Sequence, residues 1–493
     1  MIRIVTHPTP AIPSIARRNT AWRQELDPAI VDAPGSAPLL ERLHAPGALV
    51  VTTGQQPGLL TGPIYGVHKA LAAAALARRL ERMWQVPVVP IFWVAGDDHD
   101  FAEASVACWP DAAGALVRWS LPERSADAVQ RPMSQEIIPA EIVNGLALLD
   151  GTLPAGASRD MTMALLQRHY RPGATLHAAY ADTMAELLAP YGVLCLDATH
   201  PAVKRAQVPL LAAALTRAAE LDKVIAAIEA PETGIIAGDG ASLVFIETPA
   251  GRERLVADAG GFRTRRSAET VTLPALLAQL EAQPERFSAN VLLRPVVESA
   301  ILPTVAYAAG PAEFRYQTRQ ASVLYPLLGV DPQQPVRRWS GTTVEPWAER
   351  LLSRLDLTAE AVITDDGTLA HQVLQRDLPP AARDAIAALR NTIARSSEML
   401  REVGTAIDPV LTRAVNGRRD QLVRTTDGLQ RLLDRHLKRR DDIAYAQFAR
   451  LVAAFVPGGK PQERVYTAAA YLGRHGESWL GAIVAATEQW AAA

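Results

Sequence analysis

The chain has 493 residues, 49% of them hydrophobic and 21% charged, which is the composition of a globular protein with a sizeable core. Its formal net charge of −2 gives no overall attraction to nucleic acid or to an anionic membrane, so we expect neither as a partner. The two cysteines, Cys108 and Cys195, form no CxxC pattern, which excludes a disulfide framework and fits a reducing compartment.

The N-terminal stretch MIRIVTHPTPAIPS has prolines where a signal peptide needs an apolar segment. No run of the sequence reaches the ~20 apolar residues of a membrane span. We therefore expect a cytoplasmic protein.

An α/β pattern begins after a proline-rich, irregular stretch of 45 residues that holds one short helix near residues 38–43. The apolar runs 48–54 (ALVVTTG) and 86–96 (VPVVPIFWVAG) predict buried strands, and residues 65–82 between them predict a helix rich in Ala, Leu and Arg. Strand, helix and strand in this order form a βαβ unit, which predicts a parallel sheet.

The middle of the chain continues in a mixed style. Residues 158–169, 175–189, 201–228 and 273–283 predict helices, and 192–198 predicts a further strand. Residues 241–258 predict a hairpin that turns at TPAG. The stretch ILPTVAYAAG (301–310) predicts a core strand that leads into a helix beginning near Pro311.

From about residue 378 the pattern becomes that of two long amphipathic helices joined near residues 404–408. Their apolar stripes are Ile386, Leu389, Ile393, Leu400 and Val403, then Leu422, Leu429, Leu433 and Leu437. We expect an antiparallel helical coiled coil, whose stripe could pair two copies of the chain or pack on its own body. The charged run HLKRRDD (436–442) is expected to be its solvated face.

Ligands of a doubly wound sheet bind beyond the carboxyl ends of its strands. Four polar segments follow predicted strands and are therefore expected to meet in one cleft. They are GQQPGLLTGPIYGVHK (54–69), GDDHD (96–100), DATHP (197–201) and AAGPAEFRY (308–316).

The segment 54–69 places glycines before a helix N-terminus, an arrangement that suits an anion. Gln55 and Gln56 offer neutral hydrogen-bonding groups, and Thr61 could cap the helix or touch a phosphate. His68 and Lys69 could supply positive charge to a phosphate or carboxylate. The segment is neither a Walker A loop nor GxGxxG, and the alternative is a tight turn with a surface His and Lys.

The segment GDDHD could bind Mg²⁺, orient a substrate amine, or act as acid and base. Alternatively, one Asp caps a helix over 101–106 and the others are solvated. Three acids and an imidazole exceed what a cap needs. Consecutive residues rarely aim all their ligands at one point, so a substrate or nucleotide contact is favoured over a metal site.

Further polar candidates lie near residue 300. Arg294 before a proline could form a fork for carboxylate or phosphate, with Asn290 and Glu298 beside it. Glu313 could line the pocket or serve as a first-turn partner of the helix dipole. The two cysteines are expected to be buried small hydrophobes, and neither GxSxG nor HExxH occurs.

Four strings together resemble one family, the cysteine ligase (BshC) family of bacillithiol biosynthesis. They are GQQPGLLTGPIYGVHK, VPVVPIFWVAGDDHDF, NVLLRPVVESAILPTVAYAAGPAEFRY and FVPGGKPQERVY, in order from about residue 48 to the C-terminus. The family usually shows GEDHD and GPGE, where this chain has GDDHD and GPAE. Asp97 keeps the charge with a shorter reach, and Ala312 removes some backbone freedom.

The resemblance implies an α/β fold with a Rossmann-like parallel sheet core, inserted connecting segments and a C-terminal α-helical coiled-coil arm. We expect a catalytic core over 1–377, with insertions at roughly 110–190 and 230–285, an arm over 378–456, and a segment over 457–493 that packs back on the core. The implied activity is addition of cysteine to glucosaminyl-malate, with a homodimer formed through the arm.

Forming an amide from a free carboxylate is uphill in water, so we expect activation of cysteine, most simply as an acyl-adenylate from ATP or another nucleotide. The expected catalytic residues are His68, Lys69, Asp98, His99 and Asp100. The expected substrate-binding residues are Gln55, Gln56, Thr61, Gly62, Tyr65, Asp97, Asn290, Arg294, Gly310 and Glu313, with no metal ligand. The alternatives are another amino-acid ligase or nucleotidyl transferase of this fold, a nucleotide-binding scaffold, or a metal-dependent hydrolase that uses GDDHD.

Overall fold

The computed structural model describes residues 2–125, 128–235, 238–258, 260–370, 373, 380–440 and 442–493. The chain divides into two compact units. Residues 2–343 together with 460–493 form one, here called the core unit, and residues 344–459 form the other, the arm unit.

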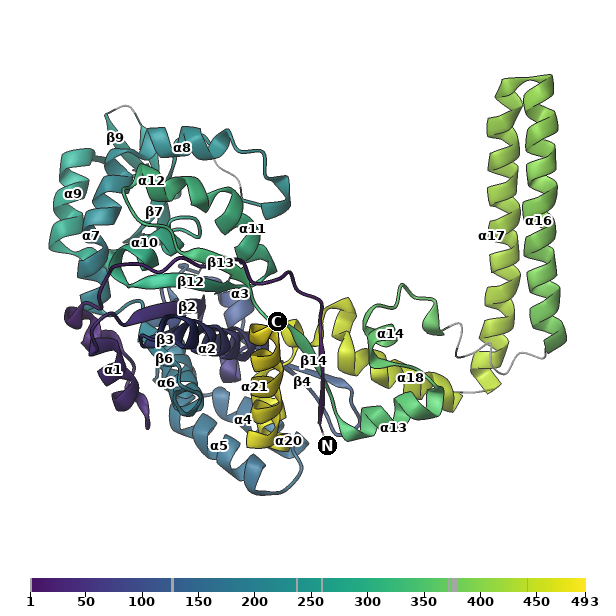
Figure 1. Ribbon diagram of the computed structural model, residues 1–493, viewed down its shortest axis with the longest axis horizontal. Coiled ribbons are helices and arrows are strands. Elements are labelled where there is room, and N and C mark those ends of the chain that lie inside the picture. Colours follow the sequence, from purple (N-terminus) through teal and green to yellow (C-terminus); the bar gives the residue numbers. More distant parts are fainter. Residues whose placement is uncertain are drawn as a thin grey trace. The chain divides into compact units, whose positions relative to one another are not determined.

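A five-stranded sheet with the order β13-β12-β2-β3-β6 is the centre of the core unit (Figure 1). All of its neighbouring strands pair in parallel, as predicted. Its strands are β2 (Leu49–Gln55), β3 (Val88–Val94), β6 (Leu194–Asp197), β12 (Thr304–Ala309) and β13 (Gln334–Arg337). The apolar runs of the sequence thus became buried strands, and β13 was not among the predicted ones.

Helix α2 (Tyr65–Trp84) connects β2 to β3 and is buried continuously from Gly66 to Ala77. Alanine dominates this stretch because the helix packs against the sheet and also against α21 (Glu477–Ala492), near the C-terminus. Small side chains let a helix approach two neighbours closely at little cost in side-chain entropy. The C-terminal segment therefore completes the layer that supports the cleft-forming end of β2.

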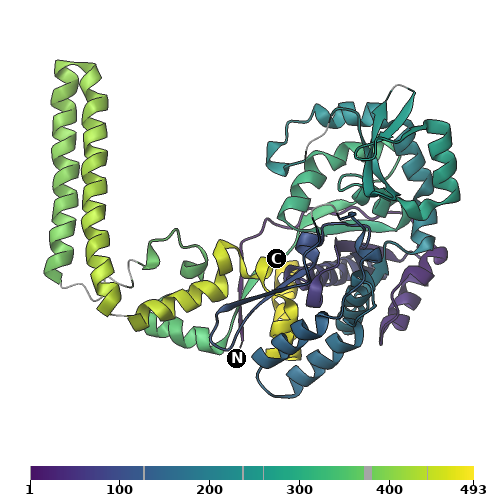
Figure 2. The same cartoon turned by 180° about the vertical axis from the view of Figure 1, so that it is seen from behind.

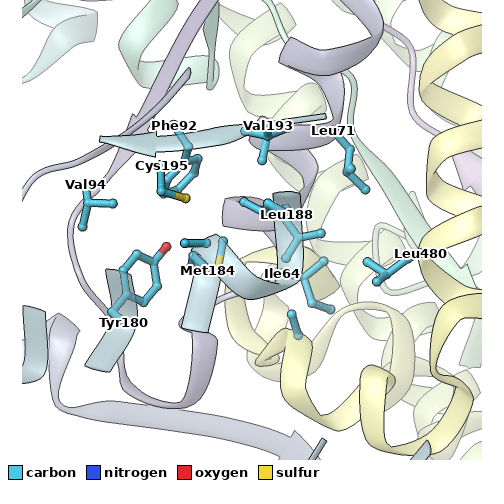
Figure 3. Close-up of a cluster of buried hydrophobic side chains, with 14 of the residues drawn as sticks. Ile64, Leu71, Phe92, Val94, Tyr180, Met184, Leu188, Val193, Cys195 and Leu480 are labelled. Atoms are coloured by element: carbon cyan, nitrogen blue, oxygen red, sulfur yellow. The ribbon is translucent and has the colours of Figure 1, made fainter. Parts of the chain in front are cut away.

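Two apolar cores cover the two faces of the sheet, because successive side chains of a strand point in opposite directions. Phe92 belongs to the first core, and its neighbour Trp93 belongs to the second. Figure 3 shows Phe92 with side chains of α6 (Leu176–Leu188) and with the buried thiol of Cys195 in the first core. Both cysteines are buried and free, as predicted.

The second core is covered by α1 (Ser36–His44), α7 (Pro201–Thr216) and α10 (Arg294–Ile301). With helices on both faces, the core unit is a doubly wound, Rossmann-like fold. The predicted helix over 201–228 is two helices, since α8 (Ala218–Ala226) begins after a break at Arg217.

A second, antiparallel sheet has the order β10-β9-β8-β7-β11. It contains the predicted hairpin, β7 (Ala241–Thr248) and β8 (Gly251–Asp258). The other strands are β9 (Gly261–Thr264), β10 (Thr270–Thr272) and β11 (Phe287–Ala289). Two further pairs of strands are β4 (Val106–Pro110) with β5 (Leu116–Ser120), and β1 (Arg3–Thr6) with β14 (Gly341–Val344).

The remaining α-helices of the core unit are α3 (Phe101–Ala104), α4 (Ile142–Thr152), α5 (Ala157–His169), α9 (Leu273–Ala282), α11 (Pro311–Arg319), α12 (Leu324–Leu327), α19 (Gln462–Val465) and α20 (Ala468–His475). None of the helices in the described residues combines the length and apolar character needed to cross a membrane.

The arm unit contains a long helical hairpin, α16 (Pro380–Ile407) and α17 (Pro409–Arg440), which lie side by side in both Figure 1 and Figure 2. The helices break at Asp408, within the predicted junction. The arm unit also contains α13 (Pro346–Leu355), α14 (Ala359–Ile363) and α18 (Asp442–Phe455). The unit begins at 344 instead of the expected 378, because α13 and α14 pack on α18.

The apolar stripe predicted for α16 is partly covered at some positions and exposed to solvent at others. Ile386 and Ile393 are partly covered, whereas the side chains of Leu400 and Val403 are 61% and 59% exposed. The buried side chains of the two helices include the polar Ser397, Thr426 and Gln430. The side chains of 436–440, which include Leu437 and most of HLKRRDD, lie outside the described residues.

Candidate active site

A cleft of about 450 Å³ opens at the carboxyl ends of β2, β3 and β12. We call it the strand-end cleft. Its polar and charged lining residues are Gln55, Gln56, Tyr65, Lys69, Asp97, Asp98, Glu103, Gln207, Arg252, Arg254, Asn290, Arg294, Glu313, Tyr316, Arg338 and Arg464. Segments 54–69, 96–100 and 308–316 therefore meet there, as the position of each after a parallel strand predicted.

Lys69 lies one turn into α2 and directs its ammonium group at the end of β2. Its Nζ donates to the Gly54 carbonyl (2.7 Å) and to Gln55 Oε1 (3.0 Å), and forms an ion pair with Glu313 (2.7 Å). Burial lowers the pKa of Lys69, and the Glu313 carboxylate opposes that shift. An ammonium group has three hydrogens, so these partners leave none for a direct bond to a phosphate.

Glu313 occupies the first turn of α11, directly after β12. Its Oε2 accepts from the Gly310 backbone N–H (2.8 Å), and its Oε1 accepts from the Tyr307 hydroxyl (2.8 Å). Burial by itself raises the pKa of Glu313, but Lys69 and Arg294 outweigh it and hold the pKa below its ordinary value. The carboxylate thus caps α11 and neutralises Lys69.

Arg294 is also neutralised within the protein. Its Nη1 lies 2.6 Å from Glu298 Oε1, and its Nη2 lies 3.5 Å from Glu313 Oε1. Neighbouring Asn290 accepts from the backbone N–H groups of Leu292 and Leu293, so its Oδ1 is used to shape the loop before α10. Both residues line the cleft, but neither offers a free charge.

The three aspartates of GDDHD have three different environments. Asp97 accepts from the buried ammonium of Lys204 at 2.6 Å. Asp100 caps α3 by accepting from the Glu103 N–H at 3.1 Å, so the predicted helix cap is confirmed. Asp98 uses Oδ1 to accept from the His99 N–H at 2.7 Å, and its side chain is 44% exposed in the cleft.

His99 turns away from the cleft opening toward the β7–β8 hairpin. Its Nδ1 lies 3.1 Å from Nη1 of Arg252, which can only donate, so Nδ1 accepts and the ring proton is on Nε2. Burial, reinforced by the Arg252 charge, lowers the pKa of His99. His99 therefore holds Arg252 in place as a neutral imidazole.

His68 lies beneath the cleft and is only 1% exposed. Its Nδ1 donates to Glu463 Oε2 (2.7 Å), and both oxygens of Glu463 accept from Arg338 (3.0 and 2.7 Å). Burial lowers the pKa of His68 in spite of this carboxylate, because Arg338 already compensates the charge of Glu463. The expected direct contact of His68 with a phosphate is therefore corrected to a buried support for Arg338.

Five of the expected site residues do not line the cleft: Thr61, Gly62, His68, His99 and Asp100. Thr61 is fully buried and bonds to Thr467, because the turn at 59–62 faces the C-terminal segment. The DATHP segment is also outside the lining, since Asp197 pairs with His177 (2.9 Å) and bonds to Thr199.

Sequence reasoning missed several cleft residues. They are Glu103, Gln207, Phe245, Arg252, Arg254, Tyr316, Arg338 and Arg464. Tyr316 and Arg464 fall inside strings that had been singled out, AAGPAEFRY and FVPGGKPQERVY, so those strings were a usable signal. Arg252 and Arg254 belong to a hairpin predicted only as a structural element, and no local pattern marked them.

Among the described residues, no group of three or more His, Cys, Asp or Glu side chains is placed to hold an ion. The aspartates of GDDHD diverge toward Lys204, the cleft and the N-terminus of α3, as expected of consecutive residues.

Comparison with known proteins matches nearly the whole chain. Residues 31–330 match the model of the BshC N-terminal Rossmann-like domain of bacillithiol biosynthesis, and residues 341–492 match that of the BshC C-terminal coiled-coil domain. Relatives named "Putative cysteine ligase BshC" include those of Koribacter versatilis, Solibacter usitatus and Bacillus velezensis. The first is 32% identical over 92% of this chain and 84% of its own length. The second is 30% identical and the third 28% identical, each over 89% of this chain and 82% of its own length. The chain therefore belongs to the cysteine ligase (BshC) family of bacillithiol biosynthesis.

Proposed function

We propose that this protein forms an amide between the carboxyl group of cysteine and the amine of glucosaminyl-malate, and that the reaction takes place in the strand-end cleft. The observation that carries the proposal is Asp98. It is an accessible carboxylate at the end of β3, in a cleft whose other wall carries several guanidinium groups. A cleft of this kind suits one cationic reactant and several anionic ones.

Activation of cysteine comes first in this scheme. A carboxylate oxygen of cysteine attacks the α-phosphorus of ATP, and pyrophosphate leaves. The amine of the acceptor then attacks the acyl carbon, AMP leaves, and the amine gives up a proton. Electrostatic stabilisation of charge that develops on the phosphate is the contribution expected from the protein.

Arg464 is the cation best placed to meet that phosphate charge. It lines the cleft, and its guanidinium carbon lies 5.9 Å from the centre of the Tyr65 ring. Among the described residues, it forms no ion pair within 4.0 Å. Lys69, whose hydrogens are taken, contributes by holding Gln55 and the end of β2, and Gln55 and Gln56 border the same region.

Asp98 is proposed to receive the acceptor amine and to take its proton. Its Oδ1 accepts from backbone N–H groups, which fixes the carboxylate, and Oδ2 is proposed to contact the amine. Asp97 is less suited, because Lys204 already compensates its charge. General-base catalysis by a positioned carboxylate contributes about 10²–10⁴-fold.

The test is to mix the protein with cysteine, glucosaminyl-malate and ATP, and to follow the amide by mass spectrometry and pyrophosphate release in parallel. Asp98→Asn is expected to lower kcat by about 10²–10⁴-fold. Asp100→Asn is the matched control, because Asn also caps helices and residue 100 is outside the cleft. Equal product without a nucleotide would refute the adenylate step.

The arm unit is proposed to pair two copies of the chain. Its two long helices bury polar side chains, while Val403, Ile407 and Val410 are 59%, 74% and 74% exposed near the end of the hairpin. An apolar group of this kind on a polar helical hairpin favours contact with an equivalent surface.

A further inference from the structure

Apart from Arg464, which is assigned to the phosphate above, the cations of the strand-end cleft fall into two groups. Lys69, Arg294 and Arg338 each have a carboxylate within 2.7 Å, supplied by Glu313, Glu298 and Glu463 respectively. The second group, Arg252 and Arg254, comes from the β7–β8 hairpin. In the described part of the chain, neither has a carboxylate within ion-pair distance.

Arg252 is fixed by neutral partners only. Its Nε donates to Ser288 Oγ (2.9 Å), its Nη1 to His99 Nδ1 (3.1 Å) and its Nη2 to the Ala289 carbonyl (3.2 Å). The residue is 8% exposed. A guanidinium group held this rigidly retains its charge and loses little freedom when an anion binds.

Arg254 stands beside Arg252 on the same face of the hairpin, because residues two apart on a strand point the same way. It pairs across the strands with Phe245. The guanidinium carbons of Arg252 and Arg254 lie 4.0 and 5.4 Å from the centre of the Phe245 ring. All three side chains line the cleft, and the aromatic ring orients both cations toward it.

A buried arginine that lacks a carboxylate is costly, and proteins tolerate it where a ligand supplies the missing charge. Two neighbouring guanidinium groups match a compact group with two negative charges, since each can form a forked pair with one carboxylate. His99, the residue after Asp98, lies 3.1 Å from Arg252, which places this pair next to the amine-receiving end of the cleft.

We propose that Arg252 and Arg254 bind the two carboxylates of the malate group of the acceptor, so that the β7–β8 hairpin determines which amino sugar is accepted. This inference rests on the proposed function for the identity of the acceptor. In glucosaminyl-malate, the malate is attached to the sugar carbon next to the one that bears the amine. An amine at Asp98 therefore brings the malate to the neighbouring hairpin. Arg294, expected from its sequence to form a fork for a carboxylate or phosphate, already has two carboxylates of its own.

The test compares glucosaminyl-malate with methyl glucosaminide, which has the amine but no malate. In Arg254→Ala, KM for glucosaminyl-malate is expected to rise about ten- to a hundredfold, as for loss of a charged hydrogen bond. KM for cysteine and for the nucleotide stays unchanged, and so does the reaction of methyl glucosaminide. Arg254→Lys keeps the charge without the fork, so its KM for glucosaminyl-malate should lie between those of the wild type and Arg254→Ala.

Arg263→Ala is the matched control, because Arg263 lies on the neighbouring strand β9 of the same sheet and outside the cleft lining. This variant should leave KM unchanged for both glucosaminyl-malate and methyl glucosaminide. If Arg254→Ala instead raises KM for the nucleotide, the proposal is overturned in favour of a phosphate site. If it raises KM for both acceptors equally, the proposal is overturned in favour of a general structural role.

Calorimetry separates this proposal from the proposed function. Binding of glucosaminyl-malate to the wild type, without nucleotide, should weaken in Arg254→Ala and not in Arg263→Ala. If binding shows this dependence while no amide ever forms, the anion subsite stands and the ligase proposal fails. If the wild type makes the amide and Arg254→Ala makes it with unchanged KM, the subsite fails and the ligase proposal stands.

Discussion

At the scale of single residues, the buried pair of Lys69 and Glu313 joins the ends of two parallel strands. Lys69 reaches from α2 to the end of β2, and Glu313 reaches from α11 to the end of β12. Their side chains are 5% and 16% exposed, so each compensates a charge that water cannot reach freely. Removing one partner leaves the charge of the other unpaired in the protein interior, which is costly.

Lys69→Met and Glu313→Gln are each expected to lower the free energy of unfolding by about 3–5 kcal/mol. The double variant should lose less than the sum of the two, because it leaves no unpaired charge. Urea denaturation of the four proteins measures this coupling. The more exposed pair Arg42 and Glu81, whose side chains are 40% and 36% exposed, is the control, with an expected coupling below about 1 kcal/mol, and equal couplings for both pairs would contradict the argument.

Two histidines, the buried His68 and the partly exposed His99, predict how stability depends on pH. Burial lowers the pKa of His68 and of His99 below the ordinary value of 6.5. The unfolded chain therefore binds more protons than the folded one just below pH 6.5. The stability that depends on neutral imidazoles is complete above that pH, and is lost as the pH falls from 6.5 through each folded pKa.

The urea concentration at the unfolding midpoint of the wild type is accordingly expected to decrease as the pH is lowered from 7.5 to 5.5. His68→Gln should show a shallower fall, since its amide can still donate to Glu463 but does not titrate. If the two proteins lose the same stability over this range, His68 does not contribute to the pH dependence.

At the scale of elements, the turn after β3 is packed too tightly to accept any side chain at its glycine. A Cβ on Gly96 would lie 2.4 Å from His177 Nδ1 and 2.8 Å from Thr199 Cγ2. The DATHP segment thus presses against the back of GDDHD and holds it without entering the cleft. DATHP follows a parallel strand, as the cleft loops do, but because of this packing it supports GDDHD and does not line the cleft.

Gly96→Ala is expected to displace GDDHD, to destabilise the protein, and to lower kcat together with the affinity for the acceptor. Gly151→Ala is the control within α4, where a Cβ meets nothing within 4 Å. It should stabilise the protein by up to about 1 kcal/mol through helix propensity. Thermal denaturation and steady-state kinetics of both variants test the contrast, and an unaffected Gly96→Ala would refute the packing argument.

The elements themselves were largely predictable from local sequence. The runs that became β2, β3 and β12 are largely apolar and each ends at Gly, and α2 is rich in alanine and leucine. By contrast, the break between α7 and α8 falls at Arg217 in LTRAAE, which contains neither Gly nor Pro. Pro209 lies inside α7 without ending it. Breaks of this kind depend on packing, which no local residue pattern records.

At the scale of the whole molecule, the arm unit determines the proposed assembly. Val403→Glu and Val410→Glu would place charges in the exposed apolar group at the end of the α16–α17 hairpin. Both are expected to convert a dimer to a monomer in sedimentation velocity, because burying an unpaired carboxylate outweighs the contact. Thr392→Glu, on an exposed position of α16, is the control. A monomeric wild type, or variants that remain dimers, would contradict the proposal.

The sequence by itself determined four of the five strands of the parallel sheet, the helical hairpin and three of the segments that border the cleft. These depend on local periodicity and on strand order, which short stretches of residues carry. Only the tertiary structure decided which polar side chains face the cleft and which are neutralised or buried beneath it.

The physical reason lies in the separation of the partners. His68 bonds to Glu463 395 residues away, His99 to Arg252 153 residues away, and Lys204 to Asp97 107 residues away. Each pair neutralises or orients a side chain that the sequence alone presents as free. The charge of a cleft is set by such pairs, so it emerges only once the chain has folded and its distant segments have met.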